Sequence, residues 1–204
     1  MKKLVSVITS TWNRRDILLT RSIPSVQLQT YPNIEHIIVC DGSDNILRQI
    51  FDISKNDKEK FVELGRNWRT FSDGKSYGAI PRLIGTYIAK GDYIAYLDDD
   101  NEFLPSHIEM LVSLLEEKNV DFVYSKMQVI QNGEIVREIG SLPPIIGAID
   151  TSIILHKAKL LNIANWRPSG YADDWDLVSR WLDNKAKYEF LNQVTMTYYK
   201  HTTP

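Results

Sequence analysis

Residues 93–101 read Tyr-Ile-Ala-Tyr-Leu-Asp-Asp-Asp-Asn, so that an apolar run is followed directly by three carboxylates and an amide. The length of the run, and the Gly91-Asp92 pair before it, predict a buried strand. An unpaired carboxylate beside an apolar core costs several kcal/mol unless an opposite charge compensates it. Mg²⁺ and Mn²⁺ are usual partners, since they prefer oxygen ligands and keep coordination sites for water and phosphate. The stretch therefore predicts a metal site that could hold a diphosphate, with a solvated acidic loop as the alternative.

The bulk composition is that of an ordinary globular protein. The chain has 204 residues, 43% hydrophobic and 25% charged, which suits one domain with a sizeable core. A formal net charge of −2 argues against a general nucleic-acid binder, which carries a basic face. The single cysteine, Cys40, excludes an internal disulfide and a thiolate metal cluster. It lies in the apolar run 37–40, which favours a buried, inert thiol.

No stretch of the sequence predicts a leader peptide or a membrane span. The basic start of the chain leads into a run that Ser6 and Thr9 interrupt, unlike the apolar centre of a signal peptide. No apolar run approaches the roughly 20 residues that cross a bilayer. We therefore expect a cytoplasmic protein without an integral membrane segment, which could still associate peripherally with a membrane.

Strand and helix signals alternate along the first half of the chain, and a hairpin signal at Gln131-Asn132-Gly133 follows. Helices are expected over 15–28 with a bend at Pro24, over 76–89 with Gly91 as the C-terminal cap, and over 106–118 with Ser106 and Glu109 as a capping box. This order predicts an α/β fold, with a mostly parallel mixed sheet flanked by helices and extended by the hairpin. Other elements are expected as strands over 4–10, 35–40, 61–64, 93–97, 121–130 and 134–139 and as helices over 45–53 and 175–182.

Polar clusters follow three of the expected strands, at 9–11, 41–43 and 98–100. In open α/β sheets, ligands bind beyond the carboxyl ends of the strands. Parallel neighbouring strands would bring the three clusters into one crevice. We therefore expect a single domain over 1–204, with a nucleotide-binding half at about 1–101 and an acceptor-binding half at about 102–204.

Four ordered motifs resemble those of glycosyltransferase family 2. Residues 5–14 (VSVITSTWNR) resemble the opening strand of the family, and residues 39–43 (VCDGS) resemble its second-strand signature. Residues 89–100 (AKGDYIAYLDDD) resemble the segment that delivers the metal-binding acids, and residues 171–177 (YADDWDL), followed by Arg180, resemble the acidic motif that supplies the base. The resemblance implies a GT-A fold, a nucleotide-sugar donor with UDP as the default, a Mn²⁺ or Mg²⁺ ion, and inversion at the anomeric carbon. It also points to polysaccharide biosynthesis.

The resemblance assigns the donor and the metal ion to residues in these motifs. Asp41 would accept the imide N–H of a uracil base, although an Asx turn is the alternative. Asp99 would bind the ribose hydroxyls with Asp98 in support, and Asp100 would ligate the metal ion; a shift of one residue in register would exchange these roles. His201 is the second candidate metal ligand, against the alternative of an exposed terminal histidine. The remaining candidates for donor binding are Thr9, Thr11, Asn13, Arg14 and Arg82.

Asp174 is the expected general base, with Asp173 beside it. It would take the proton of the acceptor hydroxyl as that oxygen attacks the sugar. The alternative reading makes both residues acidic caps of the following helix, where carboxylates interact favourably with the helix dipole. Both roles are compatible.

Two departures from the family pattern stand out. Cys40 takes the place of the first acid of the usual pair, so that one donor contact is lost or replaced. Residues 81–85 (PRLIG) stand where the family often has Ala-Arg-Asn-x-Gly, which keeps Arg82 and leaves the role of the asparagine vacant. Neither departure touches the metal or base motif.

Further side chains allow two readings each. Arg66, Arg69 and Lys75 either help to hold a diphosphate or belong to a solvated loop. Trp166 either stacks on a sugar or packs in the core, as do Tyr171 and Trp175. Asp150 follows an apolar run and would orient the acceptor.

Three other functions compete with a metal-dependent inverting glycosyltransferase that acts on a hydroxyl acceptor. A phosphohydrolase that uses Asp-x-Asp as nucleophile and acid would account for the acids at 98–100 but leaves Asp173-Asp174 and the first-strand motif unexplained. A sugar-phosphate nucleotidyltransferase would carry a glycine-rich phosphate loop after the first strand, where this chain has Thr11-Trp12-Asn13-Arg14. A non-catalytic module that binds nucleotide-sugars or glycans would not need Asp174. The sequence leaves the acceptor and the oligomeric state open.

Overall fold

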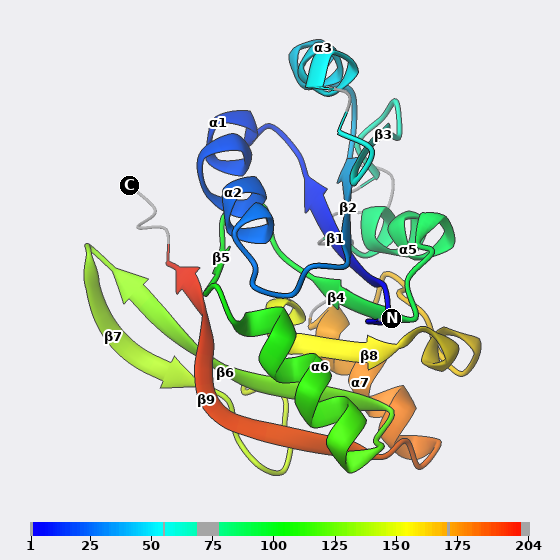
Figure 1. Ribbon diagram of the computed structural model, residues 1–204, viewed down its shortest axis with the longest axis vertical. Coiled ribbons are helices and arrows are strands. Elements are labelled where there is room, and N and C mark those ends of the chain that lie inside the picture. Colours follow the sequence, from blue (N-terminus) through cyan, green and yellow to red (C-terminus); the bar gives the residue numbers. More distant parts are fainter. Residues whose placement is uncertain (1, 55, 69–77, 171, 201–204) are drawn as a thin grey trace.

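The computed structural model describes residues 2–54, 56–68, 78–170 and 172–200. Within this part of the chain, nine strands form one sheet in the order β3-β2-β1-β4-β8-β6-β9-β5, and β7 pairs with β6 (Figure 1). The strands are β1 (Val5–Thr11), β2 (Ile34–Cys40), β3 (Glu59–Glu63), β4 (Tyr93–Tyr96), β5 (Glu102–Phe103), β6 (Phe122–Gln131), β7 (Glu134–Ile139), β8 (Ile154–Lys157) and β9 (Tyr188–Tyr199).

Helices lie on both faces of the sheet, with α6 on the near face and α7 on the far face in Figure 1. Short 3-10 turns over Thr151–Ile153 and Ala158–Asn162 flank β8. The helices are α1 (Arg15–Ile17), a π-helical turn (Leu18–Ser22), α2 (Ile23–Gln27), α3 (Asn45–Ser54), α5 (Ala79–Ile88), α6 (His107–Lys118) and α7 (Asp173–Asp183).

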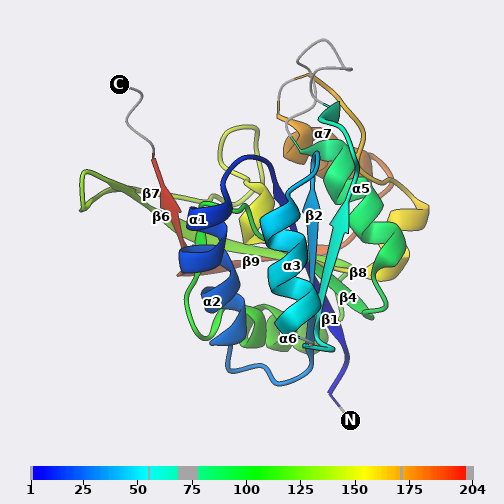
Figure 2. The ribbon, with the colours of Figure 1, turned by 90° about the horizontal axis from the view of Figure 1, so that it is seen from above.

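The amino-terminal half of the sheet is parallel and positions the site. β1 lies between β2 and β4 and runs parallel to both, and β2 runs parallel to β3. Thr11 pairs with Cys40 and Ile8 pairs with Tyr96, so the carboxyl ends of these strands reach the same edge. Figure 2 shows β1 and β2 pointing toward that edge. The predicted α/β class and the parallel order of the first strands are confirmed.

The carboxy-terminal half mixes strand directions. β8 is antiparallel to β4 and to β6, β9 is parallel to β6, and β5 is antiparallel to β9. The sequence patterns predicted the β6–β7 hairpin, whose turn residues Asn132 and Gly133 have φ values of 54° and 84°, as a type I′ turn requires. They did not predict β8 or β9.

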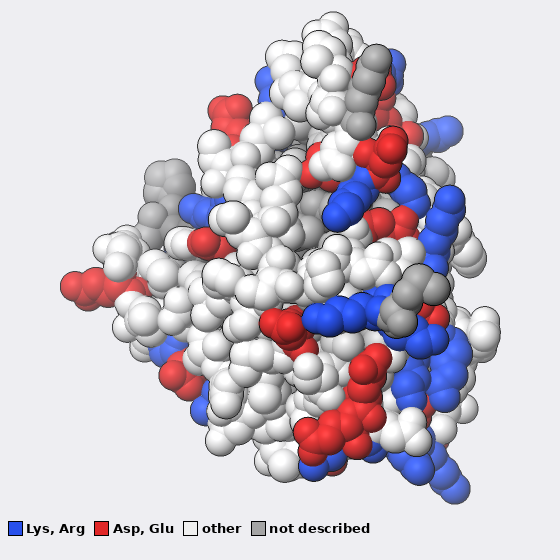
Figure 3. All heavy atoms as spheres, viewed as in Figure 1, with Lys and Arg blue, Asp and Glu red and all other residues white. Residues whose placement is uncertain are grey.

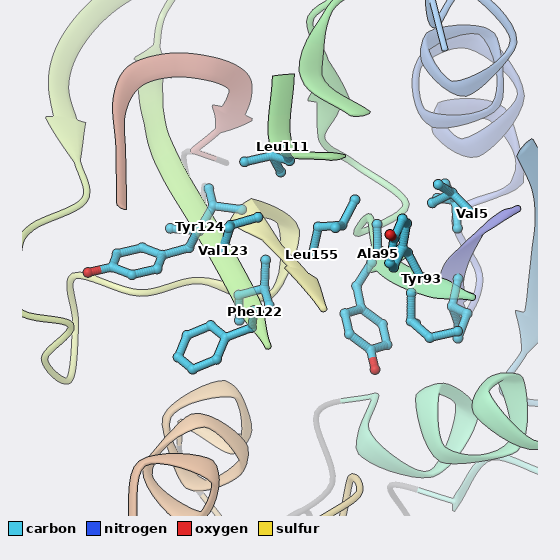
Figure 4. Packing of buried hydrophobic residues seen from close by; sticks show 14 of the residues in the cluster. Val5, Tyr93, Ala95, Leu111, Phe122, Val123, Tyr124 and Leu155 are labelled. Carbon is cyan, nitrogen blue, oxygen red and sulfur yellow. The ribbon is translucent and has the colours of Figure 1, made fainter. Parts of the chain in front are cut away.

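One apolar core joins the two halves of the sheet. Val123 on β6 and Leu155 on β8 are paired neighbours in the sheet, and Leu111 of α6 lies over them (Figure 4). Tyr93 on β4 and Val5 on β1 continue the same cluster. Strands covered on both faces are apolar nearly throughout, which explains the continuous apolar runs of the sequence.

The run 37–40 follows the same rule. Its residues are at most 3% exposed, and Cys40 is among them. Burial, with the charges of Glu63, Asp44 and Asp41, raises the pKa of the Cys40 thiol to about 12. The prediction of a buried, inert thiol is confirmed.

The expected helix over 15–28 is interrupted by a π-helical turn. The path runs from α1 through the turn at Leu18–Ser22 into α2, whose first turn contains Pro24. Proline has no N–H to donate to the carbonyl of Thr20, four residues before it. The backbone hydrogen bonds therefore change from the i to i+4 pattern of an α-helix to the i to i+5 pattern of a π-helix at this point, and the helix does not simply bend.

The predicted capping box of α6 is wrong. Ser106 makes no side-chain bond to the helix end; its hydroxyl donates to Met110 Sδ at 3.3 Å. Its backbone, at φ −96° and ψ 3°, lies outside the extended region that lets an N-cap side chain reach back. Glu109 accepts instead from Thr30 and Lys2.

The predicted C-terminal cap at Gly91 is also wrong. α5 ends at Ile88 with Ala89 as its cap, and Gly91 is not among the residues with positive φ. A Cβ at Gly91 would lie 2.6 Å from the backbone nitrogen of Ser6 and 2.6 Å from the carbonyl oxygen of Tyr93. Gly91 is therefore required by the close approach of two backbone segments.

None of the described helices is long and apolar enough to cross a bilayer. On the face seen in Figure 3, basic and acidic side chains are interspersed. Such a face agrees with the near-zero net charge of −2.

Gly91→Ala should lower the free energy of unfolding by about 1–3 kcal/mol, because the clashing atoms belong to the backbone and cannot rotate away. Urea unfolding curves measure this change. Lys90→Ala, at the exposed neighbouring position, is the matched control and should stay within about 0.5 kcal/mol of the wild type. Equal stability of the two variants would contradict the steric argument.

Candidate active site

The three polar strand ends lie around one pocket. Its volume is about 500 Å³, and it opens where β1, β2 and β4 end. The expected meeting of the three clusters is therefore found in the structure. The lining residues are Ser10, Thr11, Trp12, Asn13, Arg14, Asp41, Asn67, Gly78, Pro81, Arg82, Asp98, Asp99, Asp100 and Tyr198.

Asp99 and Asp100 are 5% and 8% exposed and are held by side chains at the end of β1 and in the segment after it. Thr11 Oγ1 donates to Asp99 Oδ2 at 2.8 Å. Arg14 Nη1 donates to Asp99 Oδ1 at 3.2 Å and also to Asp100 Oδ2. The backbone carbonyl of Asp100 accepts from Arg21 Nη1 at 2.6 Å. Two buried carboxylates thus share one arginine.

The Asp98 carboxylate pairs with a different arginine, Arg82. Arg82 Nη2 donates to Asp98 Oδ1, and Arg82 is only 7% exposed. The guanidinium lies over the ring of Trp166, 5.1 Å from its centroid. Trp166 is 2% exposed and meets Tyr96 edge-on at 5.0 Å, so it packs in the core. Arg82 is thus fixed from two sides before any ligand binds.

Asp150 and Asp174 complete a group of three carboxylates around Arg82. The Arg82 guanidinium interacts with Asp98, Asp174 and Asp150, in decreasing order among the carboxylates. Asp174 is the second residue of α7, where its Oδ1 accepts from the N–H of Trp175 at 2.7 Å. Asp150 Oδ1 accepts from the N–H of Ser152 at 2.8 Å. Arg82 lines the pocket and so links Asp174 and Asp150 to the acidic strand end, although neither of these two acids is itself among the lining residues.

Three carboxyl groups near Arg14 and Arg82, those of Asp99, Asp150 and Asp174, have pKa values above that of an ordinary aspartate. Burial raises the pKa of Asp99 to about 6, with the negative charge of Asp100 acting in the same direction. Burial, followed by the charges of Asp98 and Asp174, raises the pKa of Asp150 to about 7. Burial also raises the pKa of Asp174, although Arg82 and the Trp175 N–H oppose it. One arginine facing three acids leaves an excess of negative charge.

Asp173 lies beside Asp174 but faces another way. It is 6% exposed, and its Oδ1 accepts from the N–H of Ser169 at 2.8 Å and from the Ser169 hydroxyl at 2.5 Å. These bonds connect Ser169, in the loop before α7, to the first residue of the helix. Asp173 therefore anchors the loop that sets the position of Asp174.

Asp41 lies at the end of β2 and lines the pocket. Its Oδ1 accepts from the N–H of Trp68 at 2.8 Å, and its carbonyl accepts from Asn67 Nδ2 at 3.3 Å. The turn-forming acid of this loop is Asp44, which accepts from the N–H groups of Ile46 and Leu47 at 3.0 Å each.

The remaining candidates divide between the pocket and other places. Asn13 lines the pocket with φ 54°. Thr9 does not line it, because its hydroxyl is buried against His36 Nε2 at 2.9 Å. Arg66 lies over Trp68, 5.5 Å from the ring centroid. The candidates His201, Arg69, Lys75 and Tyr171 lie outside the described residues.

Sequence reasoning missed some of the residues that build the pocket. Tyr198, near the end of β9, lines it and interacts with Asp150, Asp100 and Asp98. The backbone N–H of Asp98 donates to Ser152 Oγ at 3.1 Å. This bond links the 3-10 turn before β8 to the acidic strand end. The aromatic pair at 198–199 was a signal for Tyr198; Ser152 offered none.

The donor chemistry of the acidic strand end fits a hard divalent cation. Carboxylate oxygens are the ligands that Mg²⁺ and Mn²⁺ prefer, and Mg²⁺ is usually bound through one or two carboxylates together with substrate phosphates. Among the described residues, no group of three or more His, Cys, Asp or Glu side chains is gathered to hold a metal ion. A cation at this strand end would therefore need further ligands, such as the phosphate oxygens of a substrate.

Comparisons with known proteins identify the family and the fold of this chain. A family model described as glycosyl transferase family 2 matches residues 6–168. The chain is 33% identical over 135 residues to UDP-Glc:alpha-D-GlcNAc-diphosphoundecaprenol beta-1,3-glucosyltransferase WfgD of Escherichia coli, which covers 65% of this chain and 49% of WfgD. It is 27% identical over 219 residues to protein CgeD of Bacillus subtilis, which covers 98% of this chain and 51% of CgeD. The chain thus spans about half the length of these relatives.

Solved structures share the fold. TarS of Staphylococcus aureus (residues 1–349), in complex with UDP, superposes with a TM-score of 0.76 at 18% identity, covering 97% of this chain and 60% of that one. The mannosyltransferase PcManGT from Pyrobaculum calidifontis, in complex with GDP-Man and Mn²⁺, gives a TM-score of 0.73 at 15% identity, covering 97% and 57%. The predicted architecture, that of GT-A glycosyltransferases, is confirmed. This chain belongs to glycosyl transferase family 2.

Proposed function

We propose that this chain transfers a sugar from a nucleotide-sugar donor to an acceptor hydroxyl, by a metal-assisted direct displacement that inverts the anomeric carbon. The observation that carries the proposal is the joining of two carboxylate groups through Arg82, which lines the strand-end pocket and interacts with Asp98 and Asp174. The family membership supports the same reaction class. Residues about 1–101 would bind the donor and residues about 102–204 the acceptor, within one domain.

The donor is expected to lie along the strand ends with its base near Asp41. A buried carboxylate at the end of β2 is suited to accept the imide N–H of uracil, and its Oδ1 is already oriented by Trp68. Asp99, fixed by Thr11, would accept the ribose hydroxyls. A UDP-sugar is our choice, supported by the UDP complex of TarS, whereas PcManGT was solved with GDP-Man.

Asp100 is proposed to bind Mn²⁺ or Mg²⁺ together with the donor diphosphate. The cation would supply Lewis-acid stabilisation of the charge that grows on the leaving diphosphate. Arg82 would add a fixed positive charge beside the leaving group, since it is buried and held by Asp98 and Trp166. His201 stays a proposed second ligand.

Asp174 is proposed to remove the proton from the acceptor hydroxyl. Its position in the first turn of α7 is rigid, and its raised pKa makes it a stronger base than an ordinary aspartate. Asp150 and Tyr198, which interact with each other, would orient the acceptor. No protein nucleophile is needed, because the acceptor oxygen itself displaces the diphosphate.

Asp174→Asn should lower kcat by about 100-fold or more while leaving donor binding intact, because the amide keeps the shape but cannot accept the proton. Transfer assays with a UDP-sugar, paired with UDP titrations, measure both properties. Asp183→Asn, at the exposed far end of the same helix, is the matched control and should behave as the wild type. Full turnover in Asp174→Asn would remove Asp174 from the base role.

The pH dependence of kcat/KM should report the raised pKa of Asp174. A base works only when deprotonated, so activity falls as the pH drops through its pKa, here above the usual value of about 3.9. Asp98→Asn should move this acidic limb to lower pH, because the charge of Asp98 raises the pKa of Asp174 and its removal lowers that pKa. Asp183→Asn should leave the limb in place. An acidic limb that Asp98→Asn leaves where the wild type has it would argue against the coupling.

A thermal-shift series with UDP and GDP, each with and without Mn²⁺, tests the donor and the cation together. We expect UDP with Mn²⁺ to raise the melting temperature most, since ligands that bind only the folded state stabilise it. Asp100→Asn should abolish the contribution of Mn²⁺, and Asp41→Asn should weaken the preference for UDP over GDP. Indifference to Mn²⁺ with every nucleotide would refute the assignment of Asp100.

A further inference from the structure

The Arg14 guanidinium occupies the position between the two carboxylates of the strand end. A single nitrogen, Nη1, donates to Asp99 Oδ1 at 3.2 Å and to Asp100 Oδ2. An arginine that binds one carboxylate strongly uses two nitrogens in a fork. Here one nitrogen bridges two residues, which is the arrangement of a cation shared between them.

The two acids keep their positions by contacts that do not involve Arg14. The second oxygen of Asp99 is held by Thr11 Oγ1 at 2.8 Å, and the backbone of Asp100 is held by Arg21 at 2.6 Å. Arg21 is itself fixed over the ring of Tyr199, 3.7 Å from the centroid. The Asp99 carboxylate and the backbone of Asp100 would therefore stay in place if Arg14 moved away.

Arg14 is the exposed member of the group and has room to move. Its side chain is 49% exposed, whereas those of Asp99 and Asp100 are 7% and 12% exposed. Arg14 lines the donor pocket and also a second pocket of about 420 Å³ on its other side. Asn13, which precedes Arg14, has a φ of 54°, in the left-handed region, and lies in the loop after β1. The Arg14 side chain can thus leave Asp100 without passing through the core.

We propose that Arg14 is a built-in counter-ion that competes with the divalent cation for Asp99 and Asp100 and moves to the donor diphosphate when the cation binds. The inference rests on the proposed function, because it requires a cation site at Asp100. Without nucleotide, the cation must displace a bound guanidinium and gains no phosphate ligand. With nucleotide, the diphosphate supplies ligands to the cation and an anionic partner to Arg14. Cation and nucleotide therefore strengthen each other's binding by the same factor.

The test is Mn²⁺ affinity in the absence of nucleotide, measured from the electron paramagnetic resonance signal of free Mn²⁺. Arg14→Gln should bind Mn²⁺ about tenfold or more tightly than the wild type, because the acids lose their competing charge. Arg14→Lys, which keeps the charge, should lie close to the wild type. Arg15→Gln is the matched control: it breaks a neighbouring pair, Arg15 Nη2 to Asp44 Oδ1 at 2.9 Å, and should leave Mn²⁺ affinity unchanged.

The same titrations with UDP present complete the test. In the wild type, UDP should tighten Mn²⁺ binding, and in Arg14→Gln this gain should shrink by at least tenfold, since Arg14 can no longer move to the diphosphate. Circular dichroism verifies that each variant is folded. Mn²⁺ affinity of Arg14→Gln equal to or weaker than that of the wild type overturns the competition. If wild-type protein with UDP binds no Mn²⁺ at all, the proposed cation site fails as well, while sugar transfer remains testable by its own assay.

Discussion

The structure depends on the burial of adjacent carboxylates at the end of β4. Asp99 and Asp100 are almost fully buried beside apolar strands, and such charges are stable only with opposite charges nearby. Arg14 after β1 supplies this charge to Asp99 and Asp100, and Arg82 in α5 pairs with the adjacent Asp98. The loop after β1 and the start of α5 must therefore converge on β4, and this convergence creates the pocket. The uncharged hydroxyl of Thr11 donates a further hydrogen bond to Asp99 and orients its carboxylate.

Neither arginine balances the acids around it. Arg14 faces two carboxylates, and Arg82 faces three, from Asp98, Asp150 and Asp174. On the exposed Arg14 side, the proposed cation would balance the excess negative charge. On the buried Arg82 side, burial and the neighbouring carboxylates raise the pKa values of Asp150 and Asp174 and so favour a bound proton. The same excess of carboxylates over arginines thus has two consequences, one around Arg14 and one around Arg82.

Local patterns failed where tertiary contacts used the same residues. Ser106 and Glu109 have the spacing of a capping box, but Glu109 bonds Thr30 and Lys2 from another segment. Gly91 stands where a helix cap would be, but the backbone of Ser6 requires it. β9 was missed because its pattern alternates only in part and its pairing with β6 shifts register near residues 125–127. The spacing of residues along the sequence indicates which local structures a segment can form, whereas contacts with residues distant in the sequence decide which one it adopts.

The sequence by itself determined the α/β class, the parallel order of the first strands, the polar clusters at their ends and the family. These follow from local information, since a strand covered on both faces is an apolar run whose ligand-binding residues come just after it. Only the tertiary structure decided that Arg14 pairs with Asp99 and Asp100, that Asp173 anchors a loop beside Asp174, and that Tyr198 joins the pocket. Such pairings join residues far apart in the chain. Their choice depends on side-chain direction and burial, which spacing along the sequence does not encode.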